Sequence, residues 1–265
     1  MQVELDYELS AGKNAENKYK ESTRYLEKLK GIDKAMQITK AKAENLKKQL
    51  EAKPGLSIQR KQTRNKDWYE KFRWFFTTND FLVIAGKDAK SNEVVVKRHF
   101  SENDLYFHCD IHGAPHTLLK NPENLELQNE DKLQAASFSA IYSSAWKNQL
   151  FSVEVYSVPY GSVSKTADSG QSLGKGAFVI RGKRDYYRKV ELRLAIFFDR
   201  EKGRLAVTPV TATDIRKDAY TVIPGDRRKS DVCKELKERF MKKGVDVSVD
   251  ELMALLPSGN CSILY

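Results

Sequence analysis

The stretch from Ala11 to Lys53 constrains the fold most, because it has no proline and consists mainly of Lys, Glu, Ala, Leu and Gln. These residues favour helix, so we predict one long helix that ends at Pro54-Gly55. Its apolar residues recur at alternating steps of four and three, the heptad pattern of a coiled coil. The eight seam positions are Tyr25, Leu29, Ile32, Met36, Thr39, Ala43, Leu46 and Leu50. Gly31 lies off the seam, and the heptad phase continues through it, which favours a straight helix over a helical hairpin that bends there.

This seam requires a second long helix. At 1.5 Å per residue it is about 40 Å long, longer than one side of a compact domain of this size. The alternative, a helix packed along the body of the protein, is therefore disfavoured. The chain contains no other heptad pattern of this length, so we expect the partner helix to come from a second copy or from an upstream segment that this chain lacks.

Positive charge is concentrated in the same part of the chain. The 265 residues have a net charge of +10. Residues 11–66 hold 16 Lys and Arg against 6 Asp and Glu, whereas residues 67–265 hold 30 against 27. Clustered cations gain affinity for polyanions by releasing counterions from phosphates. This distribution favours a nucleic-acid partner over the alternative of a solvated helix face.

The remaining composition limits where the protein works. No apolar run is long enough to cross a bilayer, and the first ten residues do not form an export signal. The three cysteines have unrelated spacings, so neither a disulfide framework nor a CxxC zinc site is predicted. We expect a cytoplasmic protein in a reducing environment, with no membrane partner.

The body of the chain predicts an α+β domain with a mixed or antiparallel sheet and few helices. We place a coiled-coil arm at residues 1–55, a basic linker at 56–67 and the α+β domain at 68–265. Strands are expected at 81–85, 93–97, 105–112, 117–120, 151–158, 177–181, 189–198, 204–210 and 220–223. Helices are expected at 129–147 and 230–243.

The segment 105–112, LYFHCDIH, has the most distinctive chemistry. As a strand it would bury its odd positions and present His108, Asp110 and His112 on the other face. A metal site is one interpretation, but residues at i, i+2 and i+4 span about 13 Å and rarely converge on one ion. A second is structural, with Asp110 orienting the imidazoles. The third is a ligand surface on which the histidines donate to phosphates or base edges.

The second distinctive segment is the Gly/Ser-rich stretch 163–184. Its glycine spacing is one residue short of a phosphate-binding P-loop, and Gly176 stands where that motif has Ser or Thr, so a nucleotide triphosphatase is excluded. Residues 160–190 carry seven basic and two acidic residues. Backbone amides, cations and tyrosines together suit a ribose-phosphate backbone. The alternative is a solubilising surface hairpin.

Several segments in order carry a resemblance to a known family: LDYELSAGKNAENKY, DWYEKFRWFFTTNDFLVIAGKDAKSNEVVVKRHF, DLYFHCDIHGAP, AASFSAIYSSAW and VSKTADSGQSLGKGAFVIRGKRDYY. Over about residues 5–184 the chain resembles the NFACT-R domain and preceding coiled-coil arm of the NEMF and RqcH family of ribosome quality-control factors, also described as fibronectin-binding-like proteins. Cys109 stands where that family commonly has a small residue, and it should affect packing alone. Residues 199–265 are less diagnostic.

The resemblance implies a function and partners. Proteins of this family bind obstructed large ribosomal subunits, hold tRNA and promote tailing of the nascent chain. By resemblance the seam helix is the second arm of an antiparallel coiled coil, and the family's NFACT-N domain and first arm are absent. We therefore predict an RNA-binding component of ribosome-associated quality control that contacts tRNA and the large subunit.

This prediction includes no catalytic residue, metal or cofactor, because the sequence offers no nucleophile with a matching base. A coiled-coil scaffold and a small metal-dependent hydrolase built on His108, Asp110 and His112 are the alternatives. The expected RNA contacts are Lys97, Arg98, His108, Asp110, His112, Lys165, Lys175, Arg181, Lys183 and Arg184.

Overall fold

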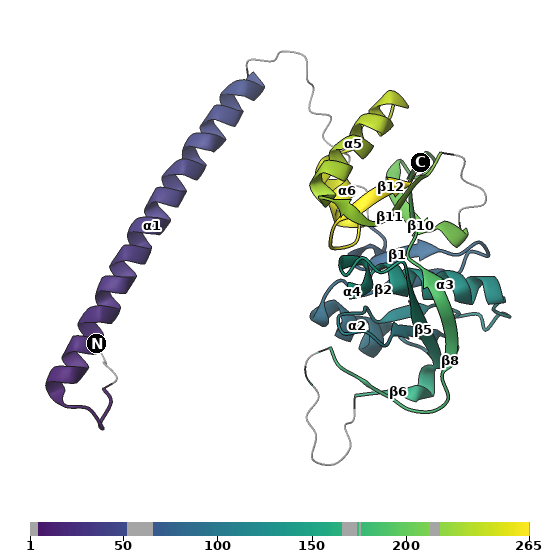
Figure 1. The fold of residues 1–265 in the computed structure, drawn as a ribbon, viewed down its shortest axis with the longest axis horizontal. Coiled ribbons are helices and arrows are strands. Elements are labelled where there is room, and N and C mark those ends of the chain that lie inside the picture. The colour runs from purple at the N-terminus through teal and green to yellow at the C-terminus, as the bar shows by residue number, and fades with distance from the viewer. Residues whose placement is uncertain (1–4, 52–65, 166–173, 175, 213–217, 265) are drawn as a thin grey trace. The chain divides into compact units, whose positions relative to one another are not determined.

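The computed structural model describes residues 5–51, 66–165, 174, 176–212 and 218–264 (Figure 1). In the N-terminal helix it describes side chains as far as Lys42 and at Glu44. The chain divides into two compact units, residues 1–65 and residues 66–265. Most of the predicted basic linker at 56–67 lies outside the described residues. No helix of the described part is long and apolar enough to cross a membrane.

The first unit is one helix, α1 (Ala11–Glu51), which confirms the predicted long helix and passes through Gly31 without a break. Within this unit the seam side chains are uncovered: Tyr25, Leu29, Ile32 and Met36 are 52–57% exposed. The seam positions Ala43, Leu46 and Leu50 lie outside the described side chains. The described apolar seam residues of α1 are therefore exposed within their own unit.

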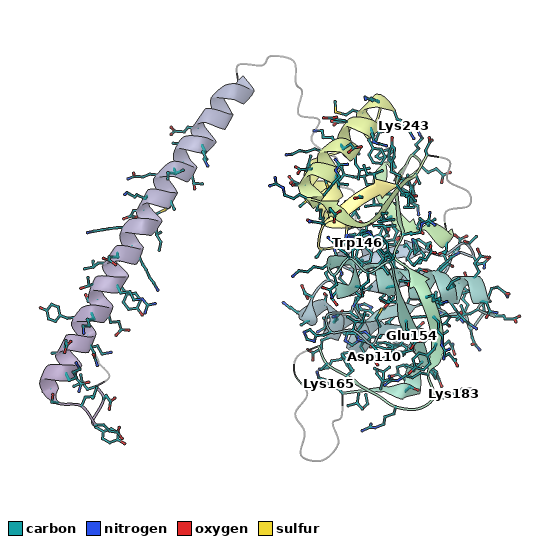
Figure 2. All side chains as sticks on the ribbon, in the orientation of Figure 1. Asp110, Trp146, Glu154, Lys165, Lys183 and Lys243 are labelled. Atoms are coloured by element: carbon teal, nitrogen blue, oxygen red, sulfur yellow. The ribbon has the colours of Figure 1, made fainter. Side chains whose placement is uncertain are left out.

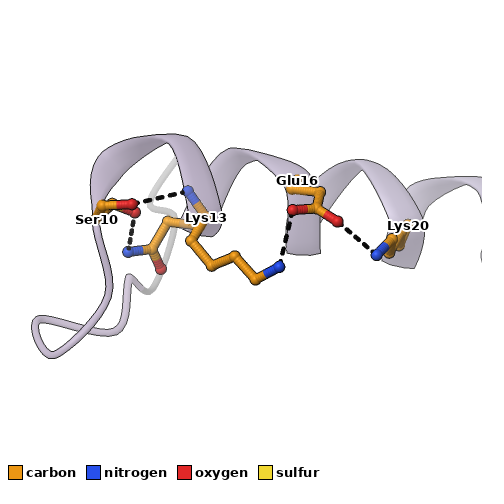
Figure 3. A network of polar contacts seen from close by, with 5 residues as sticks. Ser10, Lys13, Glu16 and Lys20 are labelled. Atoms are coloured by element: carbon orange, nitrogen blue, oxygen red, sulfur yellow. Dashed lines mark hydrogen bonds and ion pairs between the residues drawn. The ribbon is translucent and has the colours of Figure 1, made fainter.

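Short-range polar contacts fix the start of α1 (Figure 3). The Ser10 hydroxyl accepts a hydrogen bond from the Lys13 backbone amide at 3.3 Å, as an N-cap does. Asn14 is buried because its side chain accepts from the Asp6 amide at 2.9 Å and donates to the Asp6 carbonyl at 2.8 Å. Glu16 then pairs with lysines one turn before and one turn after it, at 2.9 and 2.6 Å. The turn before the helix is therefore folded back onto its first turn.

The second unit is built around a six-stranded sheet in the order β1-β2-β4-β3-β5-β8, and every neighbouring pair is antiparallel. Its strands are β1 (Arg73–Phe76), β2 (Leu82–Ala85), β3 (Leu105–Cys109), β4 (Thr117–Leu119), β5 (Ser152–Pro159) and β8 (Asp185–Glu191). A four-stranded antiparallel sheet has the order β10-β9-β11-β12. Its strands are β9 (Leu194–Asp199), β10 (Arg204–Pro209), β11 (Tyr220–Arg227) and β12 (Cys261–Leu264). These sheets confirm the predicted α+β class.

Helices and one small ribbon complete the unit. The helices are α2 (Ala89–His99), α3 (Asn129–Ile141), α4 (Ser144–Lys147), α5 (Lys229–Lys242) and α6 (Val249–Leu255), with 3-10 turns at Trp68–Lys71, Tyr160–Ser162 and Val210–Ala212. The ribbon pairs β6 (Val163–Ser164) with β7 (Val179–Ile180). In Figure 1 the ribbon and α5 lie at opposite ends of this unit.

The central strands of the six-stranded sheet are buried on both faces, whereas the edge strand β8 is mostly exposed. Phe107 and Cys109 of β3 face a core shared with α3, α5 and the four-stranded sheet, in which Trp146 is fully buried (Figure 2). Tyr106, from the same strand, lies in a second core on the other face with Val95 of α2. Apolar residues of the 163–180 segment pack against this second core. The sheet is therefore the middle layer of the unit.

This layering corrects the prediction for residues 105–112. The strand ends at Cys109, and residues 110–113 form a turn in which Gly113 has a φ of +84°. Tyr106 and His108 do not face solvent together with Asp110 and His112, because α2 and the 163–180 segment cover that side of β3. Alternation within one strand cannot reveal a second layer that is distant in sequence.

The predicted strand at 93–97 is also wrong, because these residues belong to α2. The three consecutive valines at 94–96 favour a strand locally. The Asp88 carboxylate nevertheless caps a helix by accepting from the Ser91 amide at 2.7 Å, and Val95 and Val96 are buried on one side of it. Packing of that apolar side against the sheet outweighs the strand propensity.

Three further differences concern boundaries. The predicted strand at 189–198 is two strands, β8 and β9, in different sheets. The predicted helix at 129–147 breaks at Ser143, whose hydroxyl donates to the Ala140 carbonyl and caps α4. β7 is shorter than expected, and β1, α6 and β12 were not predicted. Short elements carry too few periodic positions for a sequence pattern to show them.

Candidate nucleic-acid interface

Two histidines stack where β3 ends and β4 begins. His108 is in the antiparallel strand β3, and His116 directly precedes β4. Their ring centroids are 4.9 Å apart and their planes differ by 15°. The loop between them brings Pro115 next to His108, because His108 Nδ1 lies 3.0 Å from the Pro115 carbonyl oxygen. The pair therefore depends on the hairpin that joins these two strands.

Hydrogen bonds define the protonation state of both rings. His116 Nε2 donates to the Gly176 carbonyl at 2.8 Å, so its Nδ1 accepts from the Tyr106 hydroxyl at 2.5 Å. Burial lowers the pKa of His116 to about 4, and the neighbouring His108 contributes to this shift. Burial also lowers the pKa of His108. Both imidazoles are therefore neutral near pH 7, and the Nδ1 donor of His108 is directed to the Pro115 carbonyl.

Residues 176–178, which precede β7, form one wall beside this stack. Gly176, which His116 holds, has a φ of +80°, and a Cβ there would lie 3.0 Å from the Ala89 carbonyl oxygen at the start of α2. Lys165 donates to the carbonyls of Gly174 and Ala177 at 3.0 and 2.9 Å. Phe178 meets the His116 ring edge-on, with centroids 5.2 Å apart. The Lys165 ammonium thus holds the backbone of Gly174 and Ala177 in place.

Helix α2 forms a second wall through Asn92. The Asn92 side-chain Oδ1 accepts a hydrogen bond from the His116 backbone amide at 3.1 Å. The other polar atom of the Asn92 side chain is therefore the donor Nδ2. Gly86 makes room for this contact, because a Cβ at that position would lie 1.9 Å from Asn92 Oδ1. The Asn92–His116 hydrogen bond therefore connects α2 to the β3–β4 hairpin at His116, the residue whose ring stacks on His108.

The third wall combines Tyr156 of β5 with Arg184. The guanidinium carbon of Arg184 lies 4.5 Å from the Tyr156 ring centroid, within the range of a cation–π contact. One guanidinium nitrogen of Arg184 lies 4.0 Å from Asp110 Oδ2. The Asp110 side chain is 85% exposed, so this pair contributes little to stability. Asp110 therefore contacts an arginine rather than lying between two histidines.

These walls enclose a cavity of about 720 Å³ at the end of the sheet. Its residues come from α2, the β3–β4 hairpin, α4, β5 and the segment before β8. Besides those already named, it is lined by Arg73, Lys87, Asp88, Tyr142, Lys147 and Ile180, among others. Four cations and two carboxylates line it, so its local charge is positive.

A second cavity, of about 850 Å³, lies beside β1 and β10 and is lined by Trp74, Phe76 and Phe198, among others. Arg204, which also lines it, pairs with Glu70 at 2.7 Å and lies 4.4 Å from the Trp74 ring centroid. This cavity is lined by three cations and four carboxylates, so the first cavity is the stronger candidate for a phosphate-bearing ligand.

The structure brings four of the predicted contacts to the first cavity: His108, Asp110, His112 and Arg184. Lys165 braces its wall. Figure 2 shows Asp110, Lys165 and Lys183 toward the same end of this unit, with Lys243 at the other. Arg181 and Lys183 are exposed but do not line the cavity, and Lys175 lies outside the described residues.

Lys97 and Arg98 are in the last turn of α2, away from the cavity lining. Lys97 pairs with Glu93 one turn earlier, at 2.7 Å. The predicted contacts therefore do not all share one cavity, because Lys97 and Arg98 lie away from it.

Sequence reasoning missed His116, Asn92 and Tyr156 as site residues. His116 gave a signal, since three of the four histidines of the chain lie within residues 108–116. Asn92 and Tyr156 gave no such signal. Asn92 directly precedes the predicted strand 93–97, and Tyr156 lies in the predicted strand 151–158, to which no site residue was assigned. Among the described residues no group of three His, Cys, Asp or Glu side chains could hold a metal ion, so His108, Asp110 and His112 do not converge.

The three cysteines lie in the core of the protein. All three described cysteines are free and buried. Burial raises the pKa of the Cys109 thiol to about 12 and those of Cys233 and Cys261 to about 11. A nucleophilic cysteine requires a lowered pKa and access to solvent, so none of them is placed for covalent chemistry.

Residues 71–182 match the family described as the NFACT protein RNA binding domain. This match includes the stacked histidines, Asn92, Tyr156 and Phe178. The body therefore contains a domain of the NFACT RNA-binding type.

Full-length relatives extend the comparison. The chain is 37% identical over 219 residues to the archaeal Rqc2 homolog aRqcH of Methanocaldococcus jannaschii, which covers 82% of this chain and 32% of that protein. It is 35% identical over 199 residues to the ribosome quality control complex subunit NEMF homolog of Drosophila melanogaster (73% and 20% covered). It is 34% identical over 187 residues to the human subunit NEMF (68% and 17% covered). The chain belongs to the NEMF and RqcH family and spans at most about a third of the length of these relatives.

Proposed function

We propose that this chain is an RNA-binding component of ribosome-associated quality control, with tRNA and the large ribosomal subunit as its partners in the cytoplasm. The observation that carries the proposal is the coincidence of the RNA-binding family match with the cavity: the matched residues 71–182 supply its stacked histidines and most of its walls. The relatives are described as ribosome quality control complex subunits.

Charge supports an RNA ligand in both units. The cavity is lined by Arg73, Lys87, Lys147 and Arg184, and residues 11–66 account for the excess of cations in the whole chain. Phosphate contacts from lysine and arginine position a protein on RNA without reading its sequence. We assign Arg184, His112, Arg181 and Lys183 as contacts of the body, and Lys97 and Arg98 as a separate contact on α2.

The exposed seam of α1 supports a second partner, a long apolar helix. Four large apolar side chains in heptad positions are more than half exposed within their unit. Burying them against a matching helix would stabilise a coiled coil by removing apolar surface from water. A second copy and an upstream arm of a longer protein both meet this requirement.

The site favours binding over catalysis. A general acid or base works best with a pKa near the operating pH, whereas burial lowers the pKa of both stacked histidines. Both ring nitrogens of His116 are occupied by Tyr106 and Gly176, and Nδ1 of His108 is occupied by the Pro115 carbonyl. The buried thiols are equally unsuited to nucleophilic attack. We therefore assign the cavity a binding role.

A salt series tests the proposal. Purified chain is titrated into labelled tRNA and into large ribosomal subunits, and affinity is measured between about 50 and 200 mM salt. With about six phosphate contacts the affinity should fall by a factor on the order of 10³ over this range. A flat response would refute RNA binding through phosphate and favour the coiled-coil scaffold.

Two matched variants locate the contact. Arg184→Gln should weaken RNA binding and lower the salt slope by about one phosphate contact. Arg228→Gln removes the same charge from an exposed residue that precedes α5 and pairs with Asp231 at 3.6 Å. It should leave the slope nearly unchanged. Equal effects of the two variants would mean that binding depends on net charge rather than on the cavity.

A further inference from the structure

The cavity has a chemical division between its floor and its rim. The floor consists of rings: His108 and His116 are stacked, and the ring centroids of Tyr106 and Tyr156 each lie 6.1 Å from that of His108. The charged groups Arg184, Lys87 and Lys147 belong to the other walls of the same cavity. A ligand that fits both must present an uncharged planar part to the floor and an anionic part to the rim.

The floor does not suit a phosphate. Both imidazoles are neutral near pH 7, and His116 uses each ring nitrogen within the protein, on Tyr106 and on Gly176. Neutral imidazole and aromatic rings instead offer faces and edges to another flat ring. The cavity volume of about 720 Å³ lies within the range of about 300–1,000 Å³ typical of small-molecule sites.

Two polar groups could read the edge of such a ring. His108 donates from Nδ1 to Pro115, so in its neutral form Nε2 is an acceptor. Asn92 uses Oδ1 on the His116 amide, and its Nδ2 has no hydrogen-bond partner among the described residues. The edge of a nucleobase presents both donors and acceptors. It can therefore donate to His108 Nε2 and accept from Asn92 Nδ2.

We propose that this cavity binds a single unstacked nucleobase of an RNA strand, with its flanking phosphates on Arg184, Lys87 and Lys147. This inference rests on the proposed RNA-binding function and adds to it that one base leaves the stack and enters the protein. Unstacked bases are the parts of RNA that proteins read by ring stacking and edge hydrogen bonds. The Lys165–Gly174–Ala177 contacts and the His116–Gly176 hydrogen bond preform the wall against which the base lies.

The test compares RNA with and without bases. Single-stranded oligonucleotides of about twelve residues, as oligo(A), oligo(C) and oligo(U), are titrated against the full chain. A ribose-phosphate polymer of equal length and charge that lacks bases serves as the ligand control. Removing the bases should weaken binding about 10- to 100-fold, the effect of losing base stacking.

A blocking variant and its control locate the effect. Ala177 lines the cavity and is exposed, so Ala177→Trp fills the space without entering the core. Ala254 is an exposed alanine in α6 that lines neither cavity, and Ala254→Trp is the matched control. Ala177→Trp should lower the affinity for base-bearing RNA to that of the baseless polymer and have no further effect on the latter. Ala254→Trp should change neither affinity.

The outcomes separate this inference from the function on which it rests. Equal binding of base-bearing and baseless polymers by the unmodified chain would overturn the nucleobase site and leave RNA binding intact, and this comparison does not depend on any variant. Normal base-dependent binding by folded Ala177→Trp would also overturn it. No binding of any RNA would overturn both. In support, the Gly176 backbone amide resonance should shift on adding base-bearing RNA and remain in place with the baseless polymer.

Discussion

Acidification from about pH 7 to about pH 5 should destabilise the body through His116. The unfolded chain binds a proton on this imidazole near the ordinary pKa of 6.5, whereas burial holds the folded value at about 4. The unfolded state therefore takes up the proton first as the pH falls. The contribution of His116 to stability is fully present above about pH 6.5 and is lost progressively toward pH 4.

The size of this effect follows from the two pKa values. Each pH unit between them changes the free energy of unfolding by about 1.4 kcal/mol. About one and a half units lie between pH 6.5 and pH 5, so the loss due to His116 is about 2 kcal/mol. Structurally, protonation places a hydrogen on Nδ1, which can then no longer accept from the Tyr106 hydroxyl.

Urea denaturation at the two pH values measures the loss. His116→Gln is the comparison, because glutamine can donate and accept but does not titrate. This variant should be less stable than the parent at pH 7 but should lose about 2 kcal/mol less on acidification. Nitrogen NMR of the imidazole should show the neutral Nε2–H tautomer down to about pH 5. Titration of His116 near pH 6.5, or an unchanged pH dependence in the variant, would refute the reasoning.

Three further predictions concern groups near the sheet. Asp104→Asn should lower the free energy of unfolding by about 3 kcal/mol in urea denaturation, because it leaves the buried ammonium of Lys120 without its carboxylate; a loss under 1 kcal/mol would contradict this. Gly86→Ala should cost about 2 kcal/mol, since the new methyl group displaces Asn92 from the His116 amide; unchanged stability in the same assay would disprove the tight packing. A thiol reagent should modify none of the three cysteines in the native state at neutral pH, because all are buried; rapid labelling before unfolding would show that one is accessible.

Much of the fold was readable from local pattern. The long helix α1 followed from composition and heptad spacing, since a helix of this length has many periodic positions, and Gly31 in its interior costs too little to end it. β2, β4, β5 and β10 were predicted within a few residues because each contains apolar residues and is bounded by turn residues. α5 was predicted because its buried residues Val232, Cys233, Leu236 and Phe240 follow the helical period. The errors fell where local preference and packing disagree, as in the valines of α2, which favour a strand in isolation.

The candidate site, like the fold, was predictable in part from local sequence. The residues along the chain already indicate that histidines, a carboxylate and a basic Gly/Ser-rich segment are present, that cations are concentrated before the body, and that the chain resembles a ribosome quality-control family. The surroundings of these residues follow from the fold, because β3 is covered on both faces by segments from elsewhere in the chain. Burial by α2 and the 176–178 segment makes His108 and His116 neutral rings rather than cations, and the turn after Cys109 moves Asp110 to Arg184. Charge state and accessibility depend on such long-range neighbours, and the spacing of residues within one strand does not record them.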